Sequence, residues 1–300
     1  MRSLKIGFSR CAPTFPESYI RSFTKRAHAV LPAYWPWAIL NRAALLGKNH
    51  SCVLSSKHIK KIMRQAEAVI FDLDGCLVDT ECLSIQAIVD EMLRLGIETA
   101  SFEKIRDKFL GISMRKICTE LADQVEGFNA DRFVSRFEAR LFAEYETKVP
   151  LIKGAFEMLL SLEQAGVPIG LATGGSLRRM QKTLEYSGLS GWLQNRAFSA
   201  EQVKLGKPAP DLFLLVASQL GFAPENCFVL EDSPHGVVGG CAAGMTVLGF
   251  VGGSHLAGIK DKHASLLRAK GAAAVVSDLN AATDLFLSRG GRDCIQREVD

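Results

Sequence analysis

The sequence predicts an α/β protein whose core is a parallel β-sheet between helices, with a second block of helices inserted near its start. Short apolar runs alternate with segments of helical spacing from about residue 154 to residue 276, and this alternation is typical of βαβ units. Another apolar run, Val69–Phe71, precedes them and is separated from them by helical patterns alone. The hydrophobic content of 48% and the charged content of 23% are those of a globular protein with ample core.

The inserted block begins with residues 84–96, which place apolar side chains at helical spacing and end at Gly96. Because the chain leaves the first strand at its carboxyl end, we expect these helices to form a small separate domain over that edge of the sheet. Further helical patterns cover 102–110, 113–124 and 129–147. The predicted boundaries are 83–149 for this domain and 63–82 with 150–290 for the core.

Strands and helices alternate after Pro150 and Gly154. In parallel sheets joined by helices, ligands bind at the edge formed by the carboxyl ends of the strands. The residues that follow each strand are therefore the first candidates for a functional site. We expect strands at 167–173, 227–231, 245–250 and 273–276, and helices at 154–165, 176–187, 209–220 and 234–243.

Residues 1–62 differ from the rest of the chain in charge. They hold 11 of the 36 basic residues and one of the 32 acidic residues. The remaining residues are 25 basic and 31 acidic, which does not indicate nucleic-acid binding by the folded body. The most apolar part, 27–46, is interrupted by Pro32, Pro36 and Arg42, so it is a poor membrane span. We therefore expect neither nucleic acid nor a membrane as a partner.

Three interpretations of residues 1–62 compete. An acid-poor segment that contains Ser and Arg resembles an organellar transit peptide, and a basic tail could contact anionic partners. The third is that translation starts at Met63, just before the first strand, and that the preceding residues are upstream sequence. We favour the third and place the transit peptide second. Disorder is expected under all three.

The cysteine pattern indicates a reducing compartment. Eight cysteines are scattered along the chain without a CxxC pair or zinc-site spacing. The expected location is the cytoplasm, or an organelle if the first residues are a transit peptide.

Two acids follow the opening strand directly. Val69–Phe71 is followed by Asp72, Leu73, Asp74 and Gly75, which places Asp72 and Asp74 at the edge of the sheet where ligands bind. Taken alone, the same residues also fit an Asp-Gly hairpin turn. The choice depends on whether other strand ends supply the groups that two carboxylates would need.

The strand at 167–173 ends in a different kind of polar group. It closes on Thr173 and the glycines Gly174 and Gly175. Such a loop offers a hydroxyl and unobstructed backbone N–H groups to phosphate oxygens. Thr173 could instead cap the helix that begins near Ser176.

The strand at 227–231 repeats the opening pattern and ends on Glu231 and Asp232. Sites with several carboxylates suit Mg²⁺, a hard cation that prefers oxygen ligands. Asp232 could instead cap the helix after Pro234, but two apolar strands that both end in acidic pairs favour a metal site. Upstream, Lys207 precedes a proline and could neutralise a phosphate or hold carboxylates in place; a solvated loop lysine is the simpler alternative.

Taken in this order, Asp72, Asp74, Thr173, Lys207 and Asp232 resemble the motifs of the haloacid dehalogenase-like hydrolase superfamily. Each motif alone is weak, whereas the ordered set is highly specific and covers about residues 67–285. The resemblance implies a Rossmann-like core, and the inserted helices are similar to the α-helical cap of a subgroup that contains sugar-phosphate phosphatases, β-phosphoglucomutase and phosphoglycolate phosphatase. The motifs read Phe-Asp72-Leu-Asp74-Gly-Cys-Leu-Val-Asp-Thr80, Leu-Ala-Thr173-Gly-Gly, Lys207-Pro-Ala-Pro-Asp and Leu-Glu231-Asp232-Ser.

The resemblance implies phosphoryl transfer. Asp72 would be the nucleophile that forms an aspartyl-phosphate, and Asp74 would protonate the leaving oxygen and then activate water. Haloacid dehalogenases themselves lack the second Asp of the first motif, so Asp74 favours phosphoryl transfer over dehalogenation.

The resemblance also implies a cofactor and its ligands. Mg²⁺ would be held by Asp72, the Asp74 carbonyl and Asp232, with Glu231 assisting, and would offset repulsion between carboxylate and phosphate. The groups that would hold the phosphoryl oxygens in the transition state are Thr173, the Gly174 amide and Lys207.

Differences between this sequence and the motifs of related enzymes reduce the number of activities to expect. In β-phosphoglucomutases a histidine occupies the position of Ser84, and in phosphonatases a lysine occupies that of Met114, so both activities are disfavoured. The loop with Gly111 is expected to face the core and contact the leaving group. Arg115 is a candidate for binding an anionic or polyol substrate; a surface arginine in the first turn of a helix is the alternative.

We therefore expect a Mg²⁺-dependent phosphatase, a phosphoric monoester hydrolase for a small phosphorylated metabolite such as a sugar or sugar-acid phosphate. A phosphosugar mutase of the β-phosphoglucomutase type and a non-catalytic phosphosugar-binding protein are the alternatives. A non-catalytic protein would be expected to lose the nucleophile or a metal ligand, and both Asp72 and Asp232 are present. The sequence specifies neither the substrate nor the oligomeric state.

Overall fold

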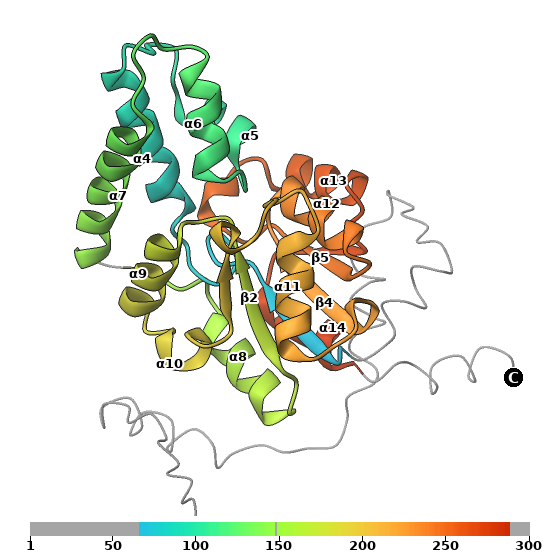
Figure 1. Ribbon diagram of the computed structural model, residues 1–300. Helices are drawn as coiled ribbons and strands as arrows, with labels where there is room; N and C mark the ends of the chain where they lie inside the picture. The colour runs from blue at the N-terminus through green and yellow to red at the C-terminus, as the bar shows by residue number, and fades with distance from the viewer. Residues whose placement is uncertain (1–65, 148, 289–300) are drawn as a thin grey trace, which may run out of the picture. The chain divides into compact units, whose positions relative to one another are not determined.

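Six short parallel strands form one sheet in the computed structural model (Figure 1). The structure describes residues 66–147 and 149–288, which belong to one compact unit. The central strand is the first in the chain, which then adds two strands on one side of it and three on the other. The spatial order is β3 (Ala197–Ser199), β2 (Ile169–Thr173), β1 (Ala68–Phe71), β4 (Cys227–Glu231), β5 (Thr246–Phe250) and β6 (Ala274–Val276).

The central strand β1 is buried on both faces, which explains its unbroken apolar sequence. Val69 is paired with Ile169 of β2, and Ile70 is paired with Val229 of β4. Side chains alternate between the two faces of a strand. Accordingly, Val69 and Phe71 belong to one hydrophobic cluster and Ile70 to another.

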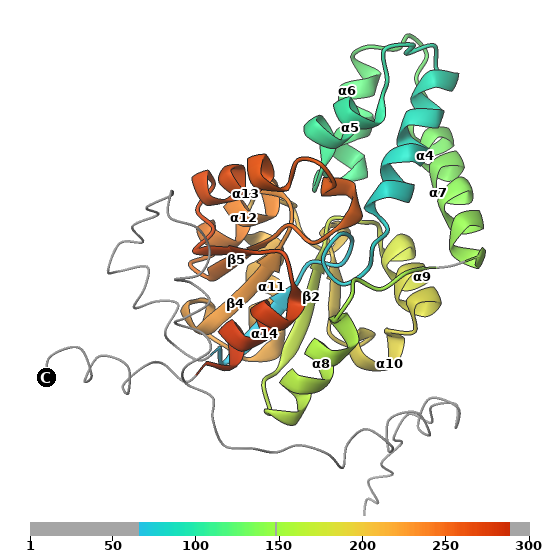
Figure 2. The same ribbon diagram turned by 180° about the vertical axis from the view of Figure 1, so that it is seen from behind.

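Helices cover both faces of the sheet (Figures 1 and 2). One group shares the cluster that contains Phe71, and the other shares the cluster that contains Ile70. This arrangement confirms the predicted α/β fold with a Rossmann-like parallel sheet. The first group is α8 (Ala155–Gln164), α9 (Leu177–Ser187), α10 (Ser190–Leu193) and α14 (Leu279–Leu287), and the second is α11 (Asp211–Leu220), α12 (Pro234–Ala242) and α13 (Lys260–Ala269).

Four of these elements, α10, β3, α13 and α14, are not predicted by the sequence patterns. The strand β3 has three residues and lies at the edge of the sheet, so it has little periodicity of its own. A signal for α14 does exist, since the Asp278 side chain accepts hydrogen bonds from the backbone N–H groups of Asn280 and Ala281. Three short 3₁₀ turns complete the core: η1 (Ala200–Gln202), η2 (Pro224–Asn226) and η3 (Ser254–Leu256).

Four helices, here called the helical insertion, lie beyond the end of the sheet (Figure 1). The most extensive contacts within it join its first and last helices, and α4 buries Ile85, Ile88, Val89 and Met92, which are spaced as one face of a helix. The helices are α4 (Glu81–Arg94), α5 (Phe102–Phe109), α6 (Met114–Ala122) and α7 (Ala130–Thr147).

The chain enters and leaves the helical insertion through two adjacent segments. Val78 and Leu151 form an antiparallel bridge. The backbone N–H of Asp79 donates to the Pro150 carbonyl at 2.8 Å, and that of Ile152 donates to the Leu77 carbonyl at 2.9 Å. The two crossings are therefore tied together beside the carboxyl end of β1.

The predictions for residues 1–62 and for a start at Met63 lie outside the described residues. Within 66–147 and 149–288, no helix has both the length and the apolar character that a membrane span requires.

Candidate active site

The ends of three neighbouring strands meet at one place. Asp72 follows β1, Thr173 ends β2, and Asp232 follows β4. Because β1 lies between β2 and β4, the chain adds strands on one side of β1 and then on the other. In parallel sheets, the position where the strand order reverses forms a crevice that binds ligands. A cavity of about 880 Å³ opens above it, between the sheet and the helical insertion. All nine residues predicted as site residues line this cavity: Asp72, Asp74, Gly111, Arg115, Thr173, Gly174, Lys207, Glu231 and Asp232.

Lys207 is a buried cation shared by two carboxylates. Its Nζ lies 2.7 Å from Glu231 Oε2 and also donates a hydrogen bond to Asp72. Burial alone would lower the pKa of Lys207, but the charges of Asp72 and Glu231 raise it above its usual value. The ammonium is therefore charged, and the alternative of a solvated loop lysine is wrong, because its side chain is 2% exposed.

Glu231 is fully engaged within the protein. Besides the contact of Oε2 with Lys207, its Oε1 accepts hydrogen bonds from the Ser233 backbone N–H at 3.1 Å and from the Ser233 hydroxyl at 2.7 Å. The carboxylate thus fixes Lys207 and the start of α12. Glu231 lies near Asp72 and Asp232, but Lys207 and Ser233 already contact both of its carboxylate oxygens.

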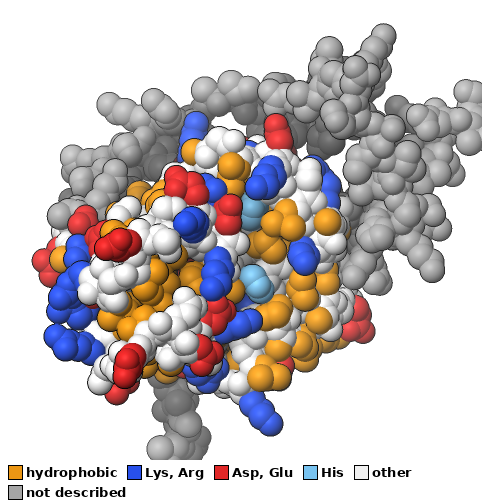
Figure 3. All heavy atoms as spheres, turned by 90° about the horizontal axis from the view of Figure 1, so that it is seen from above, with side chains coloured by type: hydrophobic (Ala, Val, Ile, Leu, Met, Phe, Trp, Pro, Cys, Tyr) orange, Lys and Arg blue, Asp and Glu red, His pale blue; other side chains and the backbone are white. Residues whose placement is uncertain are grey.

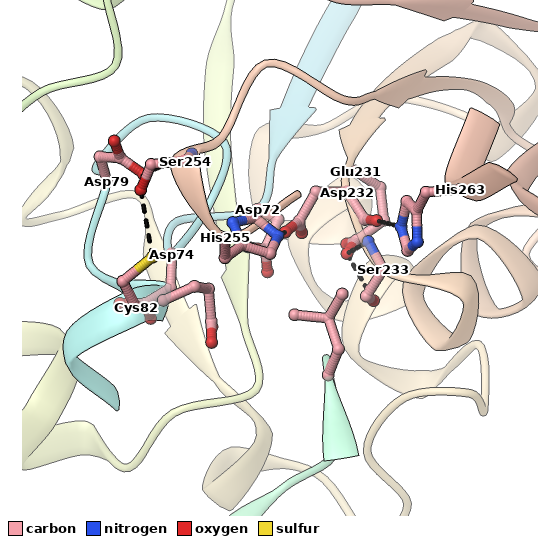
Figure 4. A network of polar contacts seen from close by, with 12 residues as sticks. Asp72, Asp74, Asp79, Cys82, Glu231, Asp232, Ser233, Ser254, His255 and His263 are labelled. Atoms are coloured by element: carbon pink, nitrogen blue, oxygen red, sulfur yellow. Dashed lines mark hydrogen bonds and ion pairs between the residues drawn. The ribbon is translucent and has the colours of Figure 1, made fainter. Parts of the chain in front are cut away.

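Asp72 and Asp232 lie close together (Figure 4). The Lys207 ammonium is shared by Asp72 and Glu231, so one positive charge serves these three acids. One carboxylate oxygen of Asp72 and one of Asp232 lie with the Cys76 Sγ in a group whose members are all within 4.8 Å of one another. Burial and the neighbouring carboxylates raise the pKa of both acids, although Lys207 opposes this shift. The Oδ2 atom of Asp232 is buried and has no hydrogen-bond partner among the described residues.

These residues fit a hard divalent cation. Buried carboxylate oxygens without a partner are the donors that such an ion requires. Burial and the nearby acids raise the pKa of the Cys76 thiol well above its usual value, so it stays protonated and leaves the oxygens as the ligands. The acidic cluster can therefore bind a metal ion through Asp72 and Asp232.

Asp74 points away from Asp232 and contacts a different set of groups. Its Oδ1 accepts a hydrogen bond from the Thr80 hydroxyl at 2.5 Å and lies 2.9 Å from Arg179 Nη2. The same guanidinium nitrogen lies 3.9 Å from Glu81 Oε1. Burial raises the pKa of Glu81 to about 7, with Arg179 acting in the opposite direction.

The two capping alternatives are wrong. Ser176 is the N-cap of α9, and its side chain accepts a hydrogen bond from the Arg179 backbone N–H. Thr173 Oγ1 instead accepts from the Gly175 N–H at 3.0 Å. In the same way Ser233, not Asp232, caps α12. Thr173 and Asp232 therefore keep their side chains at the cavity.

Gly111 lies where the helical insertion touches the core. Its φ is +75°, and a Cβ added to it would lie 2.2 Å from the Ser233 hydroxyl oxygen. A Cβ added to Gly174 would lie 3.7 Å from the Gly111 carbonyl oxygen. Arg115 is exposed in the first turn of α6 and lines the cavity. His235, in the first turn of α12, contacts the Leu110 carbonyl through Nδ1 at 3.2 Å.

Five residues near the acidic cluster were not singled out from the sequence: Cys76, Thr80, Glu81, Arg179 and His255. Thr80 is the last residue of the first motif and Glu81 begins α4, but nothing in a strand-end pattern marks the start of a helix as part of a site. Arg179 lies in an ordinary helical sequence. A signal for His255 does exist, since Gly252, Gly253, Ser254 and His255 follow an apolar strand much as the other polar groups do.

Several proteins similar to this chain are named as hydrolases or phosphatases. The model of the family described as haloacid dehalogenase-like hydrolase matches residues 69–250. Hexitol phosphatase B of Escherichia coli K12 is 33% identical over 61% of this chain and 82% of its own length. A probable pseudouridine-5'-phosphatase of Drosophila melanogaster is 30% identical over 68% of this chain and 90% of its own.

A solved structure has the same architecture. The crystal structure of a hydrolase of this family from Deinococcus radiodurans, with bound phosphate and sodium, has a TM-score of 0.56 and 32% identity. It covers 73% of this chain and 97% of the other. The two similar curated proteins are both named as phosphatases, in agreement with the enzyme class expected from the sequence, a phosphoric monoester hydrolase. The chain belongs to the haloacid dehalogenase-like hydrolase family.

Proposed function

We propose that this enzyme is a Mg²⁺-dependent phosphatase that hydrolyses a small phosphorylated metabolite through an aspartyl-phosphate on Asp72. The observation that carries the proposal is the position of Asp72, between the Lys207 ammonium and the Asp232 carboxylate at the base of a closed-over cavity. Lys207 holds the Asp72 carboxylate in place, and the same side chain lines the cavity that would receive the ligand.

In the first step an Asp72 oxygen attacks phosphorus, and the bond from phosphorus to the leaving oxygen breaks. Asp74 gives a proton to that oxygen, so an alcohol leaves. In the second step Asp74 takes a proton from a water molecule, whose oxygen attacks the aspartyl-phosphate. Inorganic phosphate leaves and the Asp72 carboxylate is restored.

Other groups at the base of the cavity would hold the phosphoryl oxygens. Lys207 supplies a positive charge, Thr173 a hydroxyl and Gly174 a backbone N–H, all on the cavity wall. A Mg²⁺ ion bound by Asp72, Asp232 and the Asp74 carbonyl would offset the repulsion between carboxylate and phosphate. Glu231 would contribute indirectly, by fixing Lys207.

We propose a sugar or sugar-acid phosphate as the substrate. Among the similar proteins, one is named a hexitol phosphatase, one a phosphorylated carbohydrates phosphatase and one a 6-phosphogluconate phosphatase. The helical insertion contributes Arg115, Asp131 and Glu138 to the cavity wall, groups that can bind hydroxyls and carboxylates. Seen from above, charges of both signs are interspersed on the surface of this side (Figure 3), so selection would rest on the cavity wall rather than on a field of one sign.

We further propose that the helical insertion acts as a cap. It forms one wall of the cavity and is joined to the core by the two paired crossings near Val78 and Leu151. Rotation about these crossings would open the cavity for exchange of substrate and product, and closure would exclude water. Gly111 would meet the core in the closed form, and Arg115 would contact the leaving group.

A phosphate-release screen over phosphorylated metabolites, with Mg²⁺ and with EDTA, tests this function. We expect release with Mg²⁺ and none with EDTA, and we expect Asp72→Asn to abolish release while its circular dichroism spectrum stays native. Full activity of Asp72→Asn would overturn the mechanism. Phosphate equal to the substrate consumed indicates a phosphatase, whereas an isomeric sugar phosphate as product would indicate a mutase.

A further inference from the structure

The short turn η3 places two adjacent residues on two different parts of the active site (Figure 4). Ser254 binds the chain at the entrance to the helical insertion: its backbone N–H and its hydroxyl donate to Asp79 Oδ1 at 3.0 and 2.8 Å. Its Oγ is also 3.2 Å from Cys82 Sγ. His255, the next residue, turns its ring to the opposite side, toward Asp232.

The His255 ring is buried against the Asp232 carboxylate. Its Nε2 lies 2.9 Å from Asp232 Oδ2, and the residue is 1% exposed. Despite this short distance, neither Oδ2 nor either ring nitrogen makes a hydrogen bond within the described residues. Buried polar atoms without a partner are costly, and a hydrogen bond between Nε2 and Oδ2 would satisfy two of these three atoms.

Two glycines form the slot that holds the ring. A Cβ on Gly75 would lie 2.2 Å from Asp232 Oδ2 and 2.9 Å from His255 Cε1. A Cβ on Gly253 would lie 2.6 Å from His255 Cε1. The loop that follows β1 and the loop that follows β5 can approach each other only because both positions lack a side chain. The imidazole is thus fixed in place by close packing as well as by its contact with Asp232.

A second buried histidine offers a comparison. His263 of α13 contacts the same residue, but its Nε2 lies 2.7 Å from the Asp232 backbone carbonyl. His263 therefore supports the backbone position, whereas His255 contacts the carboxylate itself. Only the contact with His255 can determine the rotation of the Asp232 carboxylate.

We infer that His255 is a positioning residue for Asp232: it fixes the rotation of the carboxylate so that one oxygen stays in the cluster with Asp72. The inference rests on the metal site of the proposed function. Groups that hydrogen-bond to a metal-binding carboxylate orient it and change its affinity, commonly by about 10- to 100-fold. The hydrogen bonds of Ser254 to Asp79 tie η3 to the entrance of the helical insertion and so hold the His255 ring at a fixed position beside Asp232.

Mg²⁺ titration of the full chain by isothermal calorimetry, after EDTA treatment and without substrate, tests the inference. His255→Leu fills the slot but has no N–H group, and it should weaken Mg²⁺ binding about 10- to 100-fold. His255→Gln keeps an amide nitrogen near the position of Nε2 and should stay within about 3-fold of the wild type. The control, His263→Gln, retains the His255 contact and should also stay near the wild type.

A second measurement separates positioning from a general loss of structure. Mn²⁺ binding followed by electron paramagnetic resonance should show the same order of variants, at equal thermal midpoints without metal. If His255→Leu does not fold, His255→Asn replaces it, since its shorter amide cannot reach Oδ2 and should weaken Mg²⁺ binding at least 10-fold. Unchanged Mg²⁺ affinity in a folded Leu or Asn variant overturns the inference, as does a wild-type chain that binds no Mg²⁺.

The outcome is independent of turnover. A chain that binds Mg²⁺ through this site but releases no phosphate from any substrate would overturn the proposed function and leave the role of His255 intact. If the enzyme is active, raising Mg²⁺ should restore the kcat of His255→Leu without changing KM for the substrate. A defect in kcat that persists at saturating Mg²⁺ would contradict a positioning role.

Discussion

The Nζ atom of Lys207 lies 2.7 Å from Oε2 of Glu231, and both side chains are buried. The same ammonium contacts Asp72, so one lysine is shared by two acids and a third acid, Asp232, lies close by. This imbalance of charge at the strand ends is what a divalent cation would correct. Lys207 is therefore both a structural clamp and a candidate phosphate-binding group.

Lys207→Met should lower both stability and activity. The change leaves Asp72 and Glu231 buried without their cation, and breaking a buried pair in this way costs about 3–5 kcal/mol. We expect kcat to fall by at least about 100-fold, because the positive charge that would stabilise the transferred phosphoryl group is lost. Urea unfolding and phosphate-release assays check the two effects. Lys204→Met, an exposed lysine of the same loop, is the control and should change neither.

The pH dependence of stability should report on Glu81. Burial raises the pKa of Glu81 from 4.5 to about 7, so between these values the folded state keeps a proton that the unfolded state has lost. The free energy of unfolding of the metal-free protein should therefore fall as pH rises from 4.5 to 7, by at most about 3 kcal/mol from this group. Asp72 and Asp232, whose pKa values are also raised, add slope of the same sign.

Urea unfolding in EDTA at pH 5, 6 and 7 measures this slope. Glu81→Gln should reduce the slope, because the substituted side chain cannot titrate. Glu103→Gln, an exposed acid of α5, should leave it unchanged. Identical slopes in the wild type and Glu81→Gln would show that the Glu81 carboxyl does not titrate in this range.

Gly111→Ala should disturb the contact between the helical insertion and the core. A Cβ at Gly111 would lie 2.2 Å from Ser233 Oγ, whereas a Cβ at Gly127, which has a similar φ of +67°, would meet nothing within 4 Å. Both alanine variants should lose about 1–2 kcal/mol of stability from the left-handed backbone. Only Gly111→Ala should also lower kcat/KM, by about 10- to 100-fold, since a small misplacement at a reacting site has effects of this size. Equal kcat/KM values in the two variants would show that the Gly111 contact has no role in closure.

Arg179→Met should impair the acid–base step. Arg179 Nη2 lies 2.9 Å from Asp74 Oδ1 and 3.9 Å from Glu81 Oε1, so its removal leaves buried Asp74 and partly buried Glu81 without the cation that lies near both. We expect kcat to fall by about 100-fold and the pKa of Glu81 to rise above 7, because Arg179 lowers it in the wild type. Arg179→Lys should recover part of kcat. Arg178→Met removes a neighbouring guanidinium whose side chain is 67% exposed; a kcat as low as that of Arg179→Met would contradict the argument.

The sequence alone determined five of the six strands and the acids at the edge of the sheet. The strands β1, β2 and β4 read as apolar runs because they are buried on both faces, and each run stops where the chain reaches the ligand edge. Asp72, Thr173 and Asp232 were therefore visible as polar residues that directly follow buried ones. The four helices of the insertion were visible because each buries residues at helical spacing.

The tertiary structure decided which groups surround those acids. Arg179 lies on α9 and His255 in η3, far in sequence from Asp74 and Asp232. No local pattern marks Arg179, and although His255 follows a strand, only the packing of distant segments shows that it reaches Asp232. The structure also showed that Ser176 and Ser233 cap their helices, which left Thr173 and Asp232 free for the cavity. The ends of the strands depend on local burial, which the order of apolar and polar residues in the sequence reveals. The partners of a buried charge depend instead on which distant segments pack around it.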